Sequence, residues 1–197
     1  ISIVCDRNFT PFEDGANAIR LKAGNFYLNH PWVEFMIKDL VRLIRHADSW
    51  TGPADRATVY ELLVDSHVTS KDMIEACKFD NIRYARNVLA RSQWYELVVI
   101  CWRSGQSSPI HDHLGTICGV RVVDGVATET TYREVAGGRV QPVGRREFGP
   151  DKVLISCDTD IHLITNEVAD QGLITLHLYS PALTMRYFQE EGQWNDS

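Results

Sequence analysis

The sequence lacks any uninterrupted apolar run that could cross a bilayer, which takes roughly 20 residues. Its longest apolar stretches, such as residues 97–102, are far shorter. Basic residues are not in excess either, because 20 Lys and Arg stand against 26 Asp and Glu, for a formal net charge of −6. A protein of this charge has no basic field that attracts nucleic acid or anionic lipid, so we expect neither nucleic acid nor a membrane as a partner.

Paired cysteine motifs and internal repeats are also absent. The five cysteines are an odd number and no two are spaced as Cys-x-x-Cys, which argues against a disulfide framework and a zinc ribbon. We therefore expect a reducing, cytoplasmic location. With 197 residues and 44% hydrophobic content, the chain suits a single domain over 1–197, monomeric or assembled as a small homo-oligomer.

The first part of the chain, residues 1–80, is mainly helical in its patterning. Apolar side chains recur every three or four positions over 31–45, after a proline that suits a first helical turn. A second helix is expected over about 54–64 and a third over 71–78, capped by Thr69 or the serine that follows it. We expect these α-helices to pack as one layer.

The second part, residues 81–197, changes to short segments rich in β-branched and aromatic residues. The expected strands are 82–89, 95–102, 117–123, 153–156, 161–165 and 173–179. Turn signals separate them at Asp124-Gly125, which predicts a hairpin, at Gly137-Gly138 and at Gly149-Pro150-Asp151. Many short strands with dense turns indicate an antiparallel sandwich or barrel rather than βαβ units.

Three histidines in this part are candidate metal ligands. His111 and His113 are two apart, so on a strand both imidazoles face one side, about 7 Å apart along the backbone. His162 follows on a later expected strand. A pair of histidines alone is weak evidence for a metal site, and the residues around the pair decide the interpretation.

The spacing around these histidines resembles the two motifs of the cupin family. The first motif, Gly-x5-His-x-His-x4-Glu-x6-Gly, matches Gly105, His111, His113 and Gly125, and the second, ending in His-x3-Asn, matches His162 and Asn166. The resemblance implies a mainly β fold: a small cupin, that is, an antiparallel, jelly-roll-like β-barrel, with N-terminal α-helices before it. Two departures are visible: Cys118 stands at the glutamate position, and Cys157 and Thr159 stand at the proline and glycine positions of the second motif.

The missing glutamate bears on the metal. Three neutral imidazoles leave a divalent iron its full positive charge and an open face for an anionic ligand such as a thiolate. A structural zinc site would instead use a fourth protein ligand, which Cys118 could supply. A zinc or manganese isomerase or hydrolase of this family would normally keep the glutamate.

Further segments resemble, within the cupins, the cysteine dioxygenase family of thiol dioxygenases. They are Trp102, Ser108-Pro109-Ile110-His111-Asp112-His113, Cys118 and Leu176-His177-Leu178-Tyr179-Ser180-Pro181, preceded by Arg86. The likeness runs from about residue 84 to 181. It implies one Fe(II) per chain, held by the three histidines, and an oxidoreductase that adds both atoms of dioxygen to a small thiol, converting L-cysteine to cysteine sulfinic acid. It also implies a cis peptide bond between Ser180 and Pro181.

Arg86 and Tyr84 are expected in the substrate pocket. They are two positions apart on the expected strand 82–89, so both point the same way. The planar guanidinium fork suits a carboxylate, and the family resemblance implies that Arg86 holds the carboxylate of the substrate. The alternative for Arg86 is an ion pair at the surface.

Thr175, His177 and Tyr179 alternate along the expected last strand and share one face. Buried polar groups need hydrogen-bond partners, so we expect these three to bond to one another or to a ligand. The resemblance implies that they position the Tyr179 hydroxyl beside the substrate, with Thr175 at a position where the family usually has serine. It also pairs Cys118 with Tyr179, two residues that form a thioether crosslink in some members; otherwise Cys118 is a small buried residue. Trp102 is interpreted as packing support.

Two rival functions remain open. One is a sister enzyme that oxidises 3-mercaptopropionate, a branch in which, by resemblance, a glutamine replaces the arginine near Arg86; Arg86 together with Cys118 favours L-cysteine. The other is a non-catalytic metal-binding cupin with Cys118 as the fourth ligand. Such a module has no use for an inward Arg86 or for the polar face of the last strand.

Overall fold

The computed structural model describes residues 38–191. The helices are α2 (Lys38–Asp48) and α3 (Arg56–Val64), with short 3-10 turns at Ser70–Met73 and Ala136–Gly138. The strands are β1 (Ala85–Arg91), β2 (Glu96–Trp102), β3 (His111–Asp112), β4 (Ile117–Asp124), β5 (Ala127–Glu134), β6 (Val140–Phe148), β7 (Val153–Cys157), β8 (His162–Thr165), β9 (Leu173–Ser180) and β10 (Arg186–Tyr187).

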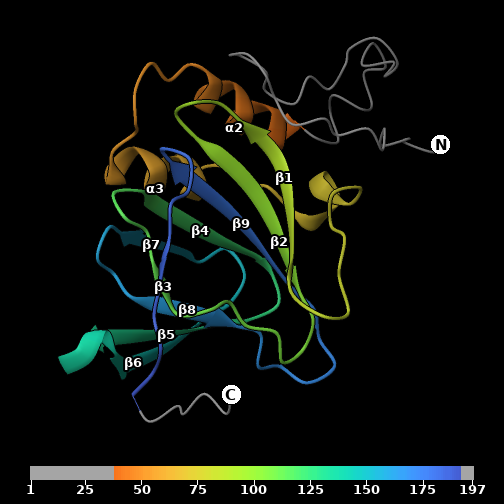
Figure 1. The fold of residues 1–197 in the computed structure, drawn as a ribbon. Helices are drawn as coiled ribbons and strands as arrows, with labels where there is room; N and C mark the ends of the chain where they lie inside the picture. The colour runs from red at the N-terminus through yellow and green to blue at the C-terminus, as the bar shows by residue number, and fades with distance from the viewer. Residues whose placement is uncertain (1–37, 192–197) are drawn as a thin grey trace.

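The strands form two five-stranded antiparallel sheets. The first has the order β1-β2-β9-β4-β7 and the second the order β10-β3-β8-β5-β6. Figure 1 shows the second sheet below the first, with α2 and α3 at the opposite end of the molecule. This arrangement confirms the predicted mainly β fold with helices before the strands. Within residues 38–191, no helix has the length and apolar character needed to cross a bilayer.

The helices agree with the sequence in part. α3 begins after Asp55, whose side chain accepts a hydrogen bond from the Thr58 amide at 2.8 Å, as an N-cap should. The expected helix over 31–45 begins outside the described residues, and α2 continues to Asp48. The expected third helix over 71–78 is wrong. The chain makes a single 3-10 turn there, because the next apolar residue, Ile74, is 69% exposed and no buried stripe supports a longer helix.

The Asp124-Gly125 turn does not close a hairpin, which corrects the sequence prediction. β4 pairs with β7 and β9 in the first sheet, whereas β5 pairs with β6 and β8 in the second, so this turn carries the chain from one sheet to the other. Gly125 has φ of +81°, and a Cβ there would lie 2.6 Å from the Gly172 carbonyl oxygen. Glycine is therefore required at this crossing both by conformation and by space.

The first strand of the barrel also differs from its expected position over 82–89. β1 begins at Ala85, because the Asp80 side chain accepts hydrogen bonds from the Ile82 and Arg83 amides and holds these residues in a turn. Ile82 is 91% exposed. Tyr84 therefore lies just before the strand, while Arg86 lies on it.

Alternation along the central strands separates two hydrophobic cores. On β2, Leu97 and Val99 belong to a core shared with α2 and α3, whereas Val98, Ile100 and Trp102 belong to a core between the sheets. The second core holds the residues that surround the candidate site. One run of apolar residues thus serves two layers because successive side chains point to opposite faces.

Candidate metal centre and adjoining cavity

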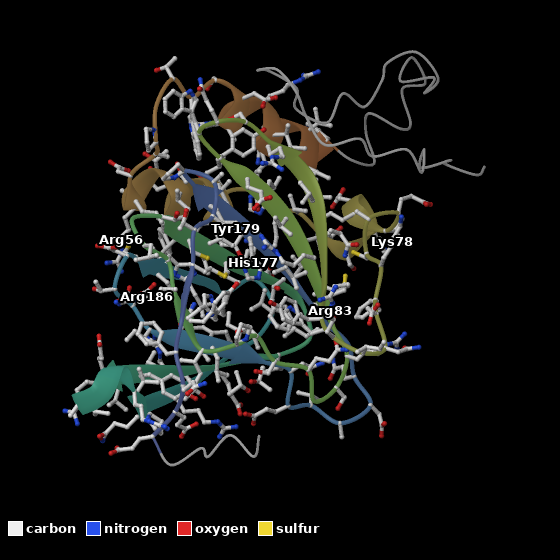
Figure 2. All side chains as sticks on the ribbon, viewed as in Figure 1. Arg56, Lys78, Arg83, His177, Tyr179 and Arg186 are labelled. Carbon is white, nitrogen blue, oxygen red and sulfur yellow. The ribbon has the colours of Figure 1, made fainter. Side chains whose placement is uncertain are left out.

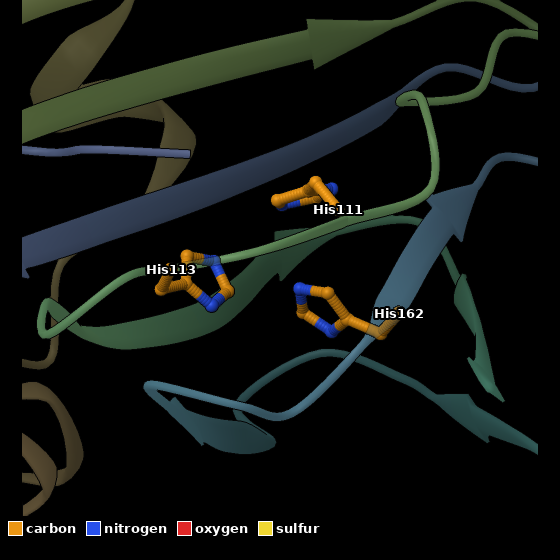
Figure 3. Close-up of side chains that lie close together, drawn as sticks. All are labelled: His111, His113 and His162. Atoms are coloured by element: carbon orange, nitrogen blue, oxygen red, sulfur yellow. The ribbon is translucent and has the colours of Figure 1, made fainter. Parts of the chain in front are cut away.

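His111, His113 and His162 converge between the sheets. His111 lies on β3, His113 directly follows that strand, and His162 begins β8, where it is the register partner of His111. One ring nitrogen from each lies within 4.8 Å of the others, and all three side chains are buried. Figure 3 shows the three imidazoles turned toward one another. The structure thus brings together the three histidines that the sequence singled out.

His111 and His113 are neutral in this environment. Burial lowers the pKa of His111 to about 4 and that of His113 to about 2, and repulsion from the positive charge that a neighbouring histidine would carry when protonated adds to each shift. The Nδ1 atom of His111 lies 2.8 Å from the Pro109 carbonyl oxygen, which can only accept, so Nδ1 carries the proton. Its Nε2 lone pair is then free for a metal.

A buried carboxylate orients the third histidine. The Nδ1 atom of His162 donates to Oε1 of Glu129 at 2.9 Å, and Arg146 donates to Oε2 of Glu129 at 2.8 Å. Burial raises the pKa of Glu129, but the hydrogen bonds from His162 and Arg146 outweigh burial and lower it below its ordinary value. Glu129 was not predicted from the sequence. In a β-strand Glu129 shares a face with the buried Ala127, which indicates that its side chain points inward. This position does not reveal which residue Glu129 contacts.

The donor set fits a divalent transition metal. Neither ring nitrogen of His113 has a hydrogen-bond partner although both are buried, and such groups are costly unless a ligand engages them. Among the described residues, the cluster of candidate ligands consists of histidines alone, so Cys118 is not a fourth ligand in this geometry. Three imidazoles with no fourth ligand from the described residues are typical of a catalytic rather than a structural metal site.

Asp112, between two of the histidines in sequence, faces away from them. Its Oδ2 atom accepts hydrogen bonds from Nε and Nη2 of Arg186 on β10, at 3.0 and 2.7 Å. Figure 2 labels Arg186 on the strand segment that runs past the site. This ion pair joins the exposed Arg186 to the buried Asp112 carboxylate and so fixes β3 against β10, with the histidine pair on the inner side.

A cavity adjoins the metal ligands, and most of the predicted site residues line it. Besides the three histidines, the lining includes Tyr84, Arg86, Trp102, Cys118, His177 and Tyr179, together with Ser108 and Met185. Thr175 is fully buried behind them. Met185 was not anticipated from the sequence, because it lies beyond the segments whose patterning carried the prediction.

Four side chains form a buried hydrogen-bond chain along one wall. The Trp102 indole Nε1 donates to Thr175 Oγ1 at 2.8 Å, and Thr175 Oγ1 lies 2.8 Å from His177 Nε2. The Nδ1 atom of His177 lies 3.0 Å from the Tyr179 hydroxyl. Figure 2 shows His177 and Tyr179 in the interior of the molecule. Trp102, interpreted from sequence as packing support, is also the donor at the far end of this chain.

Arg86 lies at the cavity mouth and takes part in an ion pair. Its Nη2 atom is 3.1 Å from Oε2 of Glu96, and its guanidinium lies 5.6 Å from the centroid of the Tyr179 ring. The Arg86 side chain is 35% exposed and that of Glu96 14%. Arg86 is therefore both a lining residue of the cavity and a partner in an ion pair, the two alternatives that the sequence left open. Glu96 was not predicted from the sequence, because it belongs to no recognisable motif.

Comparison with known proteins identifies the family. A model of the family described as cysteine dioxygenase type I matches residues 37–191. The chain belongs to this family. It is 26% identical over 151 residues to cysteine dioxygenase type 1 of Danio rerio, and 25% identical over 152 residues to that of Homo sapiens, in both cases covering 74% of each chain.

The fold of this cysteine dioxygenase family member is shared with more distant proteins. A Klebsiella pneumoniae protein with a double-stranded β-helix domain superposes with a TM-score of 0.50 at 17% identity, covering 64% of this chain and 94% of that one. The comparison confirms the predicted cupin-type barrel. Membership of the family supports a thiol dioxygenase, an oxidoreductase acting on a small molecule and dioxygen.

The structure also shows the geometry at two positions singled out by the resemblance. Cys118 on β4 and Tyr179 on β9 are direct register partners, so their side chains share one face about 5 Å apart. Burial raises the pKa of the Cys118 thiol and of the Tyr179 hydroxyl, so both are protonated at neutral pH. The peptide bond between Ser180 and Pro181 is cis, as the cysteine dioxygenase resemblance implied.

Proposed function

We propose that this chain is a non-haem iron enzyme that converts L-cysteine and dioxygen to cysteine sulfinic acid. The observation that carries the proposal is the convergence of three buried histidines on a cavity whose mouth holds Arg86 and whose wall holds Tyr179. The reaction balances without another reductant, because the thiol R–SH and O2 together contain the atoms of R–SO2H. Sulfur is oxidised and dioxygen is reduced.

His111, His113 and His162 would hold one Fe(II). When bound, the metal supplies open positions at which the thiolate and dioxygen are brought together. The absence of a carboxylate ligand leaves the site positively charged toward an anionic thiolate. Glu129 contacts His162 rather than the metal, and its negative charge offsets part of the positive charge of the site. Its hydrogen bond also fixes the His162 ring and increases the basicity of the ring.

Arg86 binds the substrate carboxylate in this proposal. A carboxylate matches the guanidinium fork through two parallel hydrogen bonds, which orients the rest of a small amino acid toward the histidines. Tyr84 supports the same wall, because its ring stacks on the Trp102 ring with a centroid separation of 4.6 Å. A non-catalytic metal-binding module would have no use for these groups.

The hydrogen-bond chain presents the Tyr179 hydroxyl proton to the cavity. An indole N–H can only donate, so Thr175 Oγ1 accepts from Trp102 and has one proton left to donate. His177 Nε2, at 2.8 Å, is a closer acceptor for this proton than the Ile100 carbonyl oxygen, at 3.5 Å. Burial, together with the charge of Arg86, lowers the pKa of His177, so its ring is neutral and its proton lies on Nδ1. That proton is donated to the Tyr179 oxygen. Tyr179 is then free to donate to the substrate or to reacting oxygen.

The test is dioxygen uptake by protein loaded with iron under anaerobic conditions, with L-cysteine and 3-mercaptopropionate in parallel and the product mass recorded. We expect uptake with L-cysteine and a product heavier by two oxygen atoms. A preference for 3-mercaptopropionate would keep the reaction class and overturn the substrate. No uptake with either thiol by iron-loaded protein would refute the proposal.

The ligand assignment has its own test. His162→Ala should abolish iron loading, measured by metal analysis, while His46→Ala, which changes an exposed histidine on α2, should load iron normally. Normal iron content in the His162 variant would show that the metal lies elsewhere.

A further inference from the structure

Glu96 lies beside Arg86, the residue proposed to bind the substrate carboxylate, and has no role in the reaction so far described. It is the first residue of β2 and the register partner of Tyr179 on β9, so its side chain emerges on the inner face of the sheet. The side chain is 14% exposed, and its Oε2 atom lies 3.1 Å from Nη2 of Arg86. The carboxylate therefore reaches the guanidinium at the mouth of the cavity without lining the cavity itself.

The geometry of a guanidinium decides what this contact leaves free. The group forms two-bond pairs with a carboxylate along two edges, Nε with Nη2 and Nη1 with Nη2, and each edge uses a different hydrogen of Nη2. Glu96 engages Nη2 through one oxygen and so occupies a hydrogen belonging to one edge. The other edge of Arg86 remains available for the carboxylate of a substrate.

A bound substrate would then share Arg86 with a second carboxylate. In the free protein the charge of Arg86 is largely compensated by Glu96, and the face of the guanidinium is covered by the Tyr179 ring, 5.6 Å from its centroid. Two carboxylates on one guanidinium repel each other, and the partly buried position of Glu96 limits screening by water.

We propose that Glu96 is a specificity-determining residue that weakens carboxylate recognition by Arg86 and so sets the affinity of the enzyme for carboxylated thiols. This inference rests on the proposed function, because it requires a thiol whose carboxylate binds Arg86. Glu96 thus competes with the substrate carboxylate for Arg86 and does not help Arg86 to bind it.

The test compares Glu96→Gln with the wild type, since glutamine keeps the shape of the side chain and removes its charge. We expect KM for L-cysteine to fall about three- to tenfold, the range expected for repulsion between two partly screened charges a few ångströms apart, with kcat changed less than twofold. Cysteamine, an aminothiol without a carboxylate, should show no change in kcat/KM. The change in KM should shrink as ionic strength rises toward about 0.5 M.

The matched control is Glu147→Gln. Glu147 also pairs with an arginine, Arg145 at 3.8 Å, but it lies on β6 in the other sheet and is 64% exposed. Its loss should leave all kinetic constants unchanged. An increase in KM for Glu96→Gln would overturn the inference, because it would mean that Glu96 orients Arg86 for binding. An unchanged KM would overturn it as well.

Binding measured without turnover separates this inference from the proposed function. L-cysteine is titrated calorimetrically into the iron-loaded wild type and Glu96→Gln proteins under anaerobic conditions. Tighter binding by the variant supports the inference even if the wild type proves to oxidise neither thiol, an outcome that would refute the proposed function alone. Equal or weaker binding by the variant overturns the inference whatever the activity.

Discussion

Glu129 places a negative charge next to a candidate metal ligand rather than on the metal itself. The cupin motif carries its glutamate at the position of Cys118 in this chain, and the structure provides a carboxylate on β5 instead. Through its hydrogen bond to His162, this carboxylate fixes the tautomer that exposes Nε2. The net charge of the site is therefore lower than the three imidazoles alone indicate.

Glu129→Gln should weaken metal binding about 10- to 100-fold, as is typical when the hydrogen-bond partner of a ligating histidine is altered. The affinity is measured by competition between the protein and a coloured chelator for Fe(II) or Co(II). Glu134→Gln is the control, because Glu134 lies on the same strand and is exposed. Equal affinities of the Glu129 variant and the wild type would show that the carboxylate has no influence on the metal.

Tyr179→Phe should remove a hydroxyl and little else, because the ring remains packed between the sheets. If the hydroxyl donates to the reacting groups, kcat should fall about 100-fold, as for the loss of other single donors in active sites, while iron content and KM stay close to wild type. Steady-state dioxygen uptake measures both constants. Tyr60→Phe, at an exposed position of α3, is the control, and an unaltered kcat in Tyr179→Phe would exclude this role.

At the scale of elements, β9 combines structural and functional roles through alternation. Ile174, Leu176 and Leu178 face the core shared with the helices, and Tyr179, together with the polar residues before it, faces the cavity. All eight residues of the strand are buried. This alternation was predicted from the sequence, because a period of two specifies which side chains share a face whatever the partner strands are.

The contact between α3 and β4 depends on a single glycine. A Cβ at Gly119 would lie 2.5 Å from Leu63 Cδ1 and 2.6 Å from Val59 Cγ1. Both of these α3 side chains are fully buried and have little room to move. Gly119 thus permits α3 to approach β4 closely. Cys118, the preceding residue, lies on the opposite face of the same strand.

Gly119→Ala should lower the free energy of unfolding by about 1–3 kcal/mol through overpacking of this contact. The measurement is equilibrium urea denaturation of the metal-free protein. Gly52→Ala should be nearly neutral, because a Cβ at Gly52 meets no atom within 4 Å. A loss of the same size in both variants would mean that backbone conformation rather than helix packing accounts for the effect.

At the scale of the whole molecule, the site is divided between the two sheets. The second sheet and the loop after β3 supply the three histidines and Glu129, whereas the first sheet supplies Arg86, Glu96 and the hydrogen-bond chain that ends at Tyr179. Figure 1 shows the two sheets as separate layers. Under the proposed function, metal binding and substrate orientation are therefore tasks of different layers.

Metal removal should lower thermal stability, because a ligand that binds the folded state alone stabilises it by mass action. With metal at about 100 times its dissociation constant, the stabilisation is about 2.7 kcal/mol, which corresponds to a Tm shift of about 5–10 °C for a chain of this length. Differential scanning calorimetry of metal-free and iron-loaded protein measures it. In His113→Ala the shift should vanish, and its persistence would place the stabilising metal at another site.

The sequence by itself determined the features that depend on local periodicity and on motif spacing. These are the mainly β architecture after N-terminal helices, the shared face of Thr175, His177 and Tyr179, and the three histidines, whose convergence the structure confirms. Alternation along a strand requires no knowledge of distant residues, which explains why these predictions succeeded.

Only the tertiary structure decided which distant residues meet. It placed Asp124-Gly125 at a crossing between sheets, set Glu129 against His162, and set Glu96 against Arg86. Each of these contacts depends on the order and register of strands that are far apart in the chain, and a turn signal or a lone carboxylate carries no information about its partner. The charge balance of the site follows from those pairings, and so it is a property of the folded barrel rather than of any segment of the sequence.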